Sequence, residues 1–259
     1  MTDDSLRSER IGRVELLTLN RPEQLNSLNL ALTNALTEAI ERIAESRDVR
    51  AVVLTGEGKA FAAGADIKEF SALDTDGWHD FITRLEAVCS GFEALPQPVV
   101  AAVAGVAFGG GFELALGCDL IVADERARFA FPEIKLGILP GAGGTQRGPR
   151  ALPLHVAKRM LFTGEPIDAP TAHHFGLVDQ LAPPGEVVEV ALARAQQLAA
   201  GPALSLAAAK RLVHRGLEVD LATAIAMERE VVTELFDSAD RVEGVSAFLE
   251  KREPNFGAT

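Results

Sequence analysis

Residues 105–144 read GVAFGGGFELALGCDLIVADERARFAFPEIKLGILPGAGG, and this stretch says most about how the chain folds and what it does. Two short apolar runs, 120–123 and 129–131, have the form of buried strands and lie between two glycine clusters. Glu113 follows three consecutive glycines, and Glu133 precedes the second cluster. Carboxylates beside bare backbone amides suggest acid/base chemistry on a substrate whose developing negative charge is held by N–H groups.

Strand and helix patterns alternate around this stretch. The apolar spacing predicts further strands at 13–19, 51–54 and 98–103, and helices at 29–44 and 78–95. Such alternation predicts an α/β domain with parallel strands and crossover helices. After residues 183–185 only helices are predicted, at 186–200, 203–215, 220–236 and 239–250. Their apolar side should dock on the core or on another subunit, through Leu221, Ile225, Val232 and Leu235.

Composition excludes several classes of protein. The 259 residues are 47% hydrophobic, which is typical of a globular chain rather than a disordered one. The net charge of −12 argues against nucleic acid as a partner, although a local pocket could still bind an anionic small molecule. No apolar run approaches the ~18 residues that a membrane span needs. The acidic start resembles neither a signal nor a transit peptide, so we expect a cytoplasmic protein.

Cysteine and histidine give no sign of a disulfide framework or a metal site. Cys89 and Cys118 lie far apart in apolar surroundings and are predicted to be buried thiols. The histidines form no ligand pattern, and His173 and His174 are interpreted as surface helix residues. No bound metal or flavin is predicted.

The sequence contains no nucleotide-binding motif. Each glycine cluster lacks the third glycine of a GxGxxG pattern, because Leu114 stands there in the first cluster and Gln146 in the second. No P-loop or GxSxG elbow is present either. The glycine clusters therefore need another explanation.

Glu113 invites two interpretations. It could be a solvated glutamate stabilised at a helix start. However, Phe112 and Leu114 beside it leave little room for water, and an unpaired carboxylate there is costly unless it has a task. The same argument applies more weakly to Glu133, because Lys135 could pair with it at the surface.

The glycines before Glu113 would let a ligand approach the backbone and leave free N–H groups at the positive end of a helix. Ala65, in the segment AAGAD at 62–66, could act in a similar way, with Asp66 capping the next helix. Two amides from separate loops that converge on one oxygen would form an oxyanion hole, which supports a reaction through an enolate-like intermediate.

Three segments together resemble the enoyl-CoA hydratase/isomerase family, also called the crotonase family: GKAFAAGADIKEF (58–70), GVAFGGGFELALGCDLIVA (105–123) and FPEIKLGILPGAGGTQR (131–147). The ends, at 20–28 and 248–256, fit the family as well. The resemblance implies an α/β fold with a spiral core of ββα turns over 1–195, which holds an acyl-CoA site. It also implies a C-terminal helical region over 196–259 that builds a homotrimer or a homohexamer.

The family resemblance also implies the chemistry. The substrate would be an acyl-CoA thioester, with no separate cofactor, and its carbonyl oxygen would bind the amides of Ala65 and Gly110. Glu113 and Glu133 match the two glutamates of the hydratase members, so water addition to a trans-2-enoyl-CoA is the leading expectation. In that mechanism Glu113 orients and activates the water, and Glu133 exchanges the C2 proton.

Further acyl-CoA contacts are implied by the same resemblance, and two of them would come from the C-terminal region or a neighbouring subunit. For Lys68 and Lys251 a solvated surface role stays open. The chain departs from the family pattern at Glu23, where some hydratases carry a basic residue, and at Phe131, where glutamine is frequent. The implied contacts are Ala63, Asp66, Ile67, Lys68, Gly109, Pro132, Gly141, Phe248 and Lys251.

Other functions stay open at this point. Within the family, the chain could be a double-bond isomerase or a hydratase for a branched-chain or aromatic-pathway enoyl-CoA. An RNA-binding or scaffold relative is a different class, and the acidic charge and the lack of a Lys/Arg cluster speak against it. The intact glutamate pair argues against an inactive relative.

Overall fold

The computed structural model describes residues 4–257 and is built on a sheet of six strands, in the order β1-β2-β3-β4-β6-β9. β1 and β2 are antiparallel, and all other neighbours in this sheet are parallel, as the alternating pattern predicted. The strands are β1 (Leu6–Ile11), β2 (Val14–Leu19), β3 (Ala51–Gly56), β4 (Val99–Val103), β6 (Leu120–Asp124) and β9 (Gln180–Ala182).

A second sheet of three strands sets the position of the site. It contains β5 (Val106–Phe108), β7 (Arg128–Ala130) and β8 (Ile167–Asp168). β4 leads into β5 and then into α4 (Gly110–Leu116), and β6 leads into β7 and then into the 3-10 helix η2 (Pro132–Leu136), so a two-strand-plus-helix unit is repeated. Because β5 and β7 are parallel and in register, the chain leaves them side by side, and the Gly109 amide donates to the Ala130 carbonyl at 2.9 Å.

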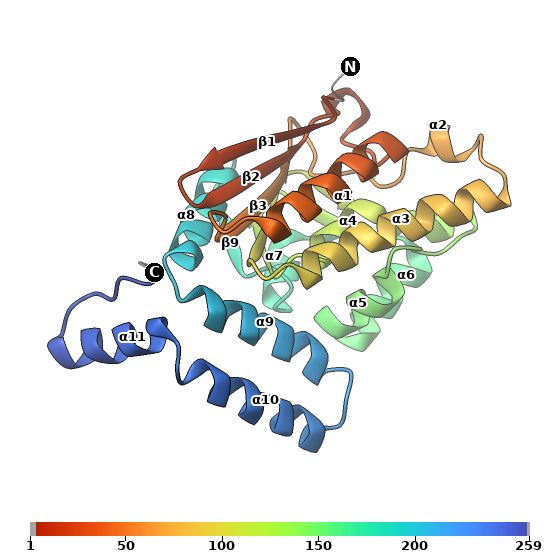
Figure 1. Cartoon of the computed structure of the whole chain (residues 1–259). Coiled ribbons are helices and arrows are strands. Elements are labelled where there is room, and N and C mark those ends of the chain that lie inside the picture. Colours follow the sequence, from red (N-terminus) through yellow and green to blue (C-terminus); the bar gives the residue numbers. More distant parts are fainter. Residues whose placement is uncertain (1–3, 258–259) are drawn as a thin grey trace.

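Helices cover both faces of the large sheet. α1 (Leu30–Glu45) and α3 (Thr75–Ala94) lie side by side across one face, and α8 (Val187–Ala199) covers the other (Figure 1). Strand β3 shows why both faces need cover, because all of its residues before Gly56 are buried. Val52 and Leu54 pack into the larger core with α1 and α3, while Ala51 and Val53 pack with α8.

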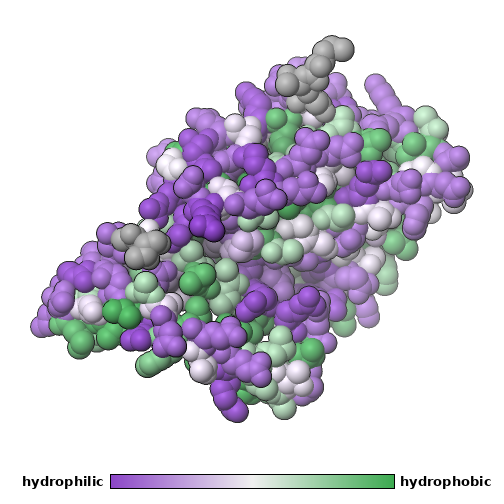
Figure 2. All heavy atoms as spheres, in the orientation of Figure 1, coloured by the Kyte–Doolittle hydropathy of each residue, from purple (hydrophilic) through white to green (hydrophobic). Residues whose placement is uncertain are grey.

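The C-terminal helices extend away from this core. α9 (Ala203–Gly216) and α10 (Leu221–Leu235) run side by side, and α11 (Ala239–Glu250) continues outward (Figure 1). Hydrophobic residues gather at the surface of this region (Figure 2), including Leu221, which is 75% exposed. This apolar side therefore does not dock on the core of its own chain, and docking on another subunit stays a prediction.

Predicted helices and strands agree with the structure to within a few residues, and no strand follows residue 183 in the described chain. The division at residue 195 stays a prediction, and it falls inside α8. The thiol of Cys89 is buried as expected, whereas Cys118 is half-buried. The remaining short elements are η1 (Pro22–Gln24), α2 (Ile67–Phe70), α5 (Gly144–Ala151), α6 (Leu154–Thr163) and α7 (Ala169–His174).

Candidate active site

Two backbone N–H groups converge at the start of α4. A bridge between Leu28 and Ala65 uses the amides of Leu28 and Asp66, each at 2.8 Å, and leaves the Ala65 N–H pointing away from it. Gly110 is the first residue of α4, so its N–H has no acceptor in the helix. A Cβ built on Gly110 would lie 3.8 Å from the Ala65 nitrogen. Within residues 4–257 neither N–H donates to another group, and the two lie close together.

Glu113 lies in the first turn of α4 and is 2% exposed, so the solvated interpretation is wrong. Its Oε1 accepts hydrogen bonds from the amides of Ala142 and Gly144, at 2.8 and 2.7 Å. Burial raises the pKa of Glu113 above its ordinary value, and the two amides and the charge of Arg147 partly offset that rise. The carboxylate is thus fixed in place by backbone donors and removed from bulk water.

Glu133 approaches the same place from η2. A Cβ on Gly109 would lie 2.6 Å from its Oε1, so only glycine at 109 leaves room for this carboxyl group. Its Oε2 is buried and has no hydrogen-bond partner among the described residues, and none of the ion pairs there includes Lys135. Burial, reinforced by the negative charge of Glu113, raises the pKa of Glu133 to about 7.

Both glutamates and both residues with free amides, Ala65 and Gly110, line one cavity of about 90 Å³. An apolar wall of the cavity comes from α2 and α3: the rings of Phe70 and Trp78 lie 5.1 Å apart, and Ile82 and Leu85 also line it. The cavity therefore combines two carboxyl-bearing residues and two free backbone amides with an apolar wall.

Most of the acyl-CoA contacts expected from the sequence surround this cavity. Those that line it are Ala63, Ile67, Gly109, Pro132 and Gly141.

Asp66 and Lys68 lie beside the cavity but do not line it. The Asp66 carboxylate is bound by Arg21 at 2.9 Å, and it caps α2 by accepting from the Lys68 amide at 3.1 Å, which confirms the predicted cap. The Lys68 side chain is exposed to solvent.

Phe248 and Lys251 are not brought to the cavity of their own chain. Phe248 is 82% exposed on α11, and Lys251 follows the end of that helix. A contact with the nucleotide of a neighbouring subunit stays a prediction.

Sequence reasoning missed the apolar wall and the loop that holds Glu113. Trp78, the only tryptophan, lies near the start of α3, and it was the one residue in the sequence that could have indicated this wall. Ala142 and Gly144 bind Glu113 through backbone N–H groups, so their side chains give no indication of this role. Phe112 and Phe131, which come just before Glu113 and Glu133 in sequence, pack in the core with ring centroids 4.6 Å apart and do not line the cavity.

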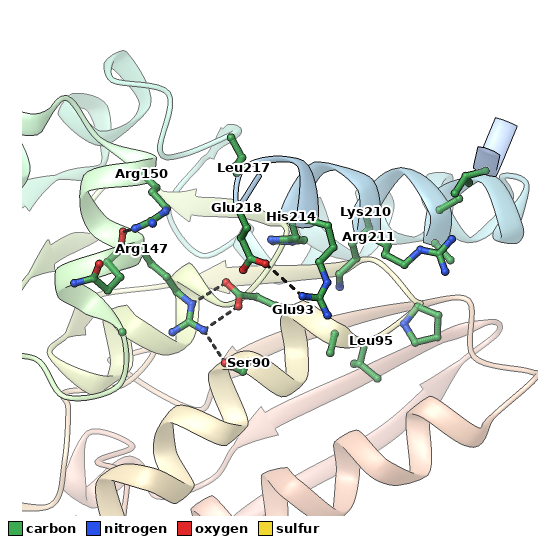
Figure 3. Close-up of a pocket in the computed structure, with 18 of the residues that line it drawn as sticks. Ser90, Glu93, Leu95, Arg147, Arg150, Lys210, Arg211, His214, Leu217 and Glu218 are labelled. Carbon is green, nitrogen blue, oxygen red and sulfur yellow. Dashed lines mark hydrogen bonds and ion pairs between the residues drawn. The ribbon is translucent and has the colours of Figure 1, made fainter. Parts of the chain in front are cut away.

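A much larger cavity, of about 1400 Å³, lies between α3, α5 and the helices α9 and α10 (Figure 3). It shares Leu139 and Gly141 with the smaller cavity but reaches neither glutamate nor the two free amides. We place the chemistry in the smaller cavity for that reason. Among residues 4–257 no group of three metal-ligating side chains occurs, and no helix there is long and apolar enough to cross a membrane.

The family model described as Enoyl-CoA hydratase/isomerase matches residues 9–259. The chain belongs to this family. A probable enoyl-CoA hydratase of Rhizobium meliloti is 43% identical over 258 residues, with 99% of each chain covered. The 2,3-dehydroadipyl-CoA hydratase of Escherichia coli is 44% identical and covers 95% of this chain and 96% of its own.

Solved structures of the crotonase family confirm the fold. The crystal structure of enoyl-CoA hydratase from Bacillus anthracis is similar with a TM-score of 0.96 and 38% identity, covering 99% of this chain and 100% of that one. The spiral α/β core and the helical C-terminal region are thus those of a crotonase-family protein.

Proposed function

We propose that the chain is an enoyl-CoA hydratase, which adds water in syn fashion to a trans-2-enoyl-CoA and gives a 3-hydroxyacyl-CoA. The observation that carries the proposal is the pair Glu113 and Glu133, brought from α4 and η2 to the cavity that the free amides of Ala65 and Gly110 line. The names of the relatives, several of which are enoyl-CoA hydratases, support the same activity.

The thioester oxygen binds between the amides of Ala65 and Gly110. Water attack at C3 moves negative charge onto this oxygen, and the two donors and the positive end of α4 stabilise the enolate that forms. Loss of one such donor typically costs about 3–4 kcal/mol of transition-state stabilisation. Donors that are fixed before the reaction need no rearrangement when the charge develops.

The two carboxyl groups share the proton chemistry. Ionised Glu113, held by its two backbone donors, orients the water and takes its proton as the oxygen bonds to C3. Glu133 has a pKa of about 7, so near neutral pH it can hold the proton that it delivers to C2. The pair begins and ends with one proton. Water addition changes no net oxidation state, so the proposed reaction needs no redox cofactor.

We infer a short acyl group as the preferred substrate. The hydrocarbon chain would pack against Phe70, Trp78 and Ile82, which belong to the apolar lining of a small cavity. A short acyl group would fill that space without moving α2 or α3.

We also propose that the chain acts as a homotrimer or a dimer of trimers, without nucleic acid or a membrane as partner. The exposed apolar faces of α9, α10 and α11 support self-association. In such an assembly Phe248 and Lys251 would approach the CoA of a neighbouring subunit.

Product analysis tests the reaction class. The purified protein is incubated with crotonyl-CoA in H₂¹⁸O, and separately with a 3-enoyl-CoA. We expect 3-hydroxybutyryl-CoA carrying ¹⁸O at C3 from the first substrate. Conversion of the 3-enoyl-CoA to the 2-enoyl isomer, with no hydration of crotonyl-CoA, would show a double-bond isomerase instead.

A further inference from the structure

Arg147 in α5 makes an unusually complete set of contacts between α5 and α3 (Figure 3). Its Nε and Nη2 donate to the two carboxylate oxygens of Glu93, at 2.7 and 2.8 Å, and Nη2 also donates to the Ser90 hydroxyl at 2.9 Å. The side chain is only 14% exposed. A forked guanidinium–carboxylate pair of this kind fixes geometry as well as charge.

The fourth contact of Arg147 leads to the active site. Its Nη1 donates to the Ala142 carbonyl at 2.8 Å, and the amide of that same residue donates to Glu113 Oε1 at 2.8 Å. Arg147 therefore holds the loop that supplies both backbone donors of Glu113. The other end of the guanidinium is anchored on α3, which also forms the apolar wall of the cavity.

Gly143 gives independent support for a fixed path of the Arg147 side chain. Its φ is +102°, and a Cβ there would lie 2.0 Å from Arg147 Nη1. The loop thus has the one residue type that lets the guanidinium pass close to the backbone.

We propose that Arg147 is a positioning residue for the reaction, which sets the place of the Glu113 carboxylate through the Ala142 peptide without touching the substrate. This inference rests on the proposed hydratase function, because it concerns the residue that orients the water. An ion pair with a purely structural role would hold α5 on α3 but would leave the chemical step unchanged.

The charges around Glu113 determine the effect on pH dependence. Arg147 of α5 faces it with a positive charge, Glu133 of η2 with a titratable carboxyl group, and Cys89 of α3 with a buried thiol whose pKa is raised well above its ordinary value. Because the Arg147 charge lowers the pKa of Glu113, loss of that charge raises it. The acid limb of the rate profile then moves to higher pH.

Arg147→Gln is the test, with Arg150→Gln as a matched control. Arg150 lies on the same helix and lines the same large cavity, but its contact is with the Gln146 carbonyl in its own helix. We expect Arg147→Gln to lower kcat for crotonyl-CoA by about 10–100-fold with KM nearly unchanged, since a small misplacement of a catalytic group has effects of this size. Arg147→Lys keeps the charge but cannot form the two parallel hydrogen bonds to Glu93. It should recover part of kcat and return the acid limb of the rate profile to its wild-type pH.

If Arg147→Gln does not fold, Glu93→Gln provides a second test of the proposal. It leaves Arg147 charged but weakens the fork, so we expect a smaller fall in kcat in the same direction. Wild-type kcat in either variant, or a lowered Tm with kcat and the acid limb unmoved, would overturn the positioning role. If the wild-type protein does not hydrate any enoyl-CoA, the proposed function fails instead, so the two failures are distinct.

Discussion

At the scale of single residues, Gly109 decides whether Glu133 can reach the site. Its φ is +52°, and any Cβ would fall 2.6 Å from the Glu133 carboxylate. We expect Gly109→Ala to lower kcat for crotonyl-CoA by about 10²-fold, because it displaces a proton donor at the reacting carbon.

Gly137→Ala is the control for a side chain at positive φ that meets no neighbouring group; Gly137 has the left-handed conformation, whereas Gly109 has ψ of −126°. Gly137 has φ of +77° with nothing within 4 Å of a built Cβ, so this variant adds only the conformational cost, about 1–2 kcal/mol. We expect a lower Tm and nearly normal kcat. Equal kcat in the two alanine variants would show that glycine at 109 is needed only for its backbone conformation and not to leave room for Glu133.

The shared proton of the two glutamates predicts a bell-shaped rate profile. The active form holds one proton on the pair, so activity falls at high pH when Glu133, with a pKa of about 7, loses it. At low pH it falls when Glu113 gains a second proton. The equilibrium constant for water addition contains no proton, so kcat/KM should show the same limbs for hydration and for dehydration. A rate that stays flat up to pH 9 would argue against the shared proton.

The sequence predicted a residue's environment correctly where that environment is formed by residues adjacent in the chain. Phe112 and Leu114 correctly indicated that Glu113 is buried. The amides that hold its carboxylate come from residues about 30 positions later, and their donor role depends on loop geometry rather than on side-chain type. The fork between Arg147 and Glu93 is likewise a contact between distant segments and was not predicted.

At the scale of elements, we expect α3 to limit the length of the acyl group that the cavity accepts. Ile82 contacts the Gly141 loop, because a Cβ on Gly141 would lie 2.9 Å from Ile82 Cδ1. We expect Ile82→Ala to raise the ratio of kcat/KM for trans-2-decenoyl-CoA to that for crotonyl-CoA by roughly 10-fold, since a hydrophobic pocket discriminates by a few kcal/mol at most. Leu154→Ala, at an exposed position of α6, should leave the ratio unchanged. An unchanged ratio in Ile82→Ala would place the end of the acyl group elsewhere.

Elements with strong local patterns were predictable, and elements made by tertiary contacts were not. α1 and β3 have regular apolar spacing, and both were predicted within two residues. β1 has the polar sequence LRSERI and is a strand because it pairs along its whole length with β2 at the sheet edge. α5 contains Pro149, which disfavours a helix, and it packs closely on the core, because a Cβ on Gly148 would lie 3.0 Å from the Phe131 ring.

At the scale of the whole molecule, the exposed C-terminal helices predict assembly. Leu221, Ile225 and Val232 form one apolar side of α10 and are 75%, 46% and 61% exposed. Light scattering should give three or six times the mass of one chain. We expect Leu221→Glu to lower this mass, and Glu230→Lys, on the opposite side of the same helix, to leave it unchanged. A wild-type mass equal to one chain would refute the proposed assembly.

The claim on which the account depends is that Glu113 and Glu133 act together on one water, beside a carbonyl held by backbone amides. The most direct measurement is the rate of crotonyl-CoA hydration by Glu113→Gln, Glu133→Gln and the double variant, with folding checked by circular dichroism. We predict a loss of at least about 10²-fold in each single variant and little further loss in the double variant, because groups that act as a unit are not additive. Near-normal turnover in either single variant, or losses that multiply in the double variant, would contradict the claim.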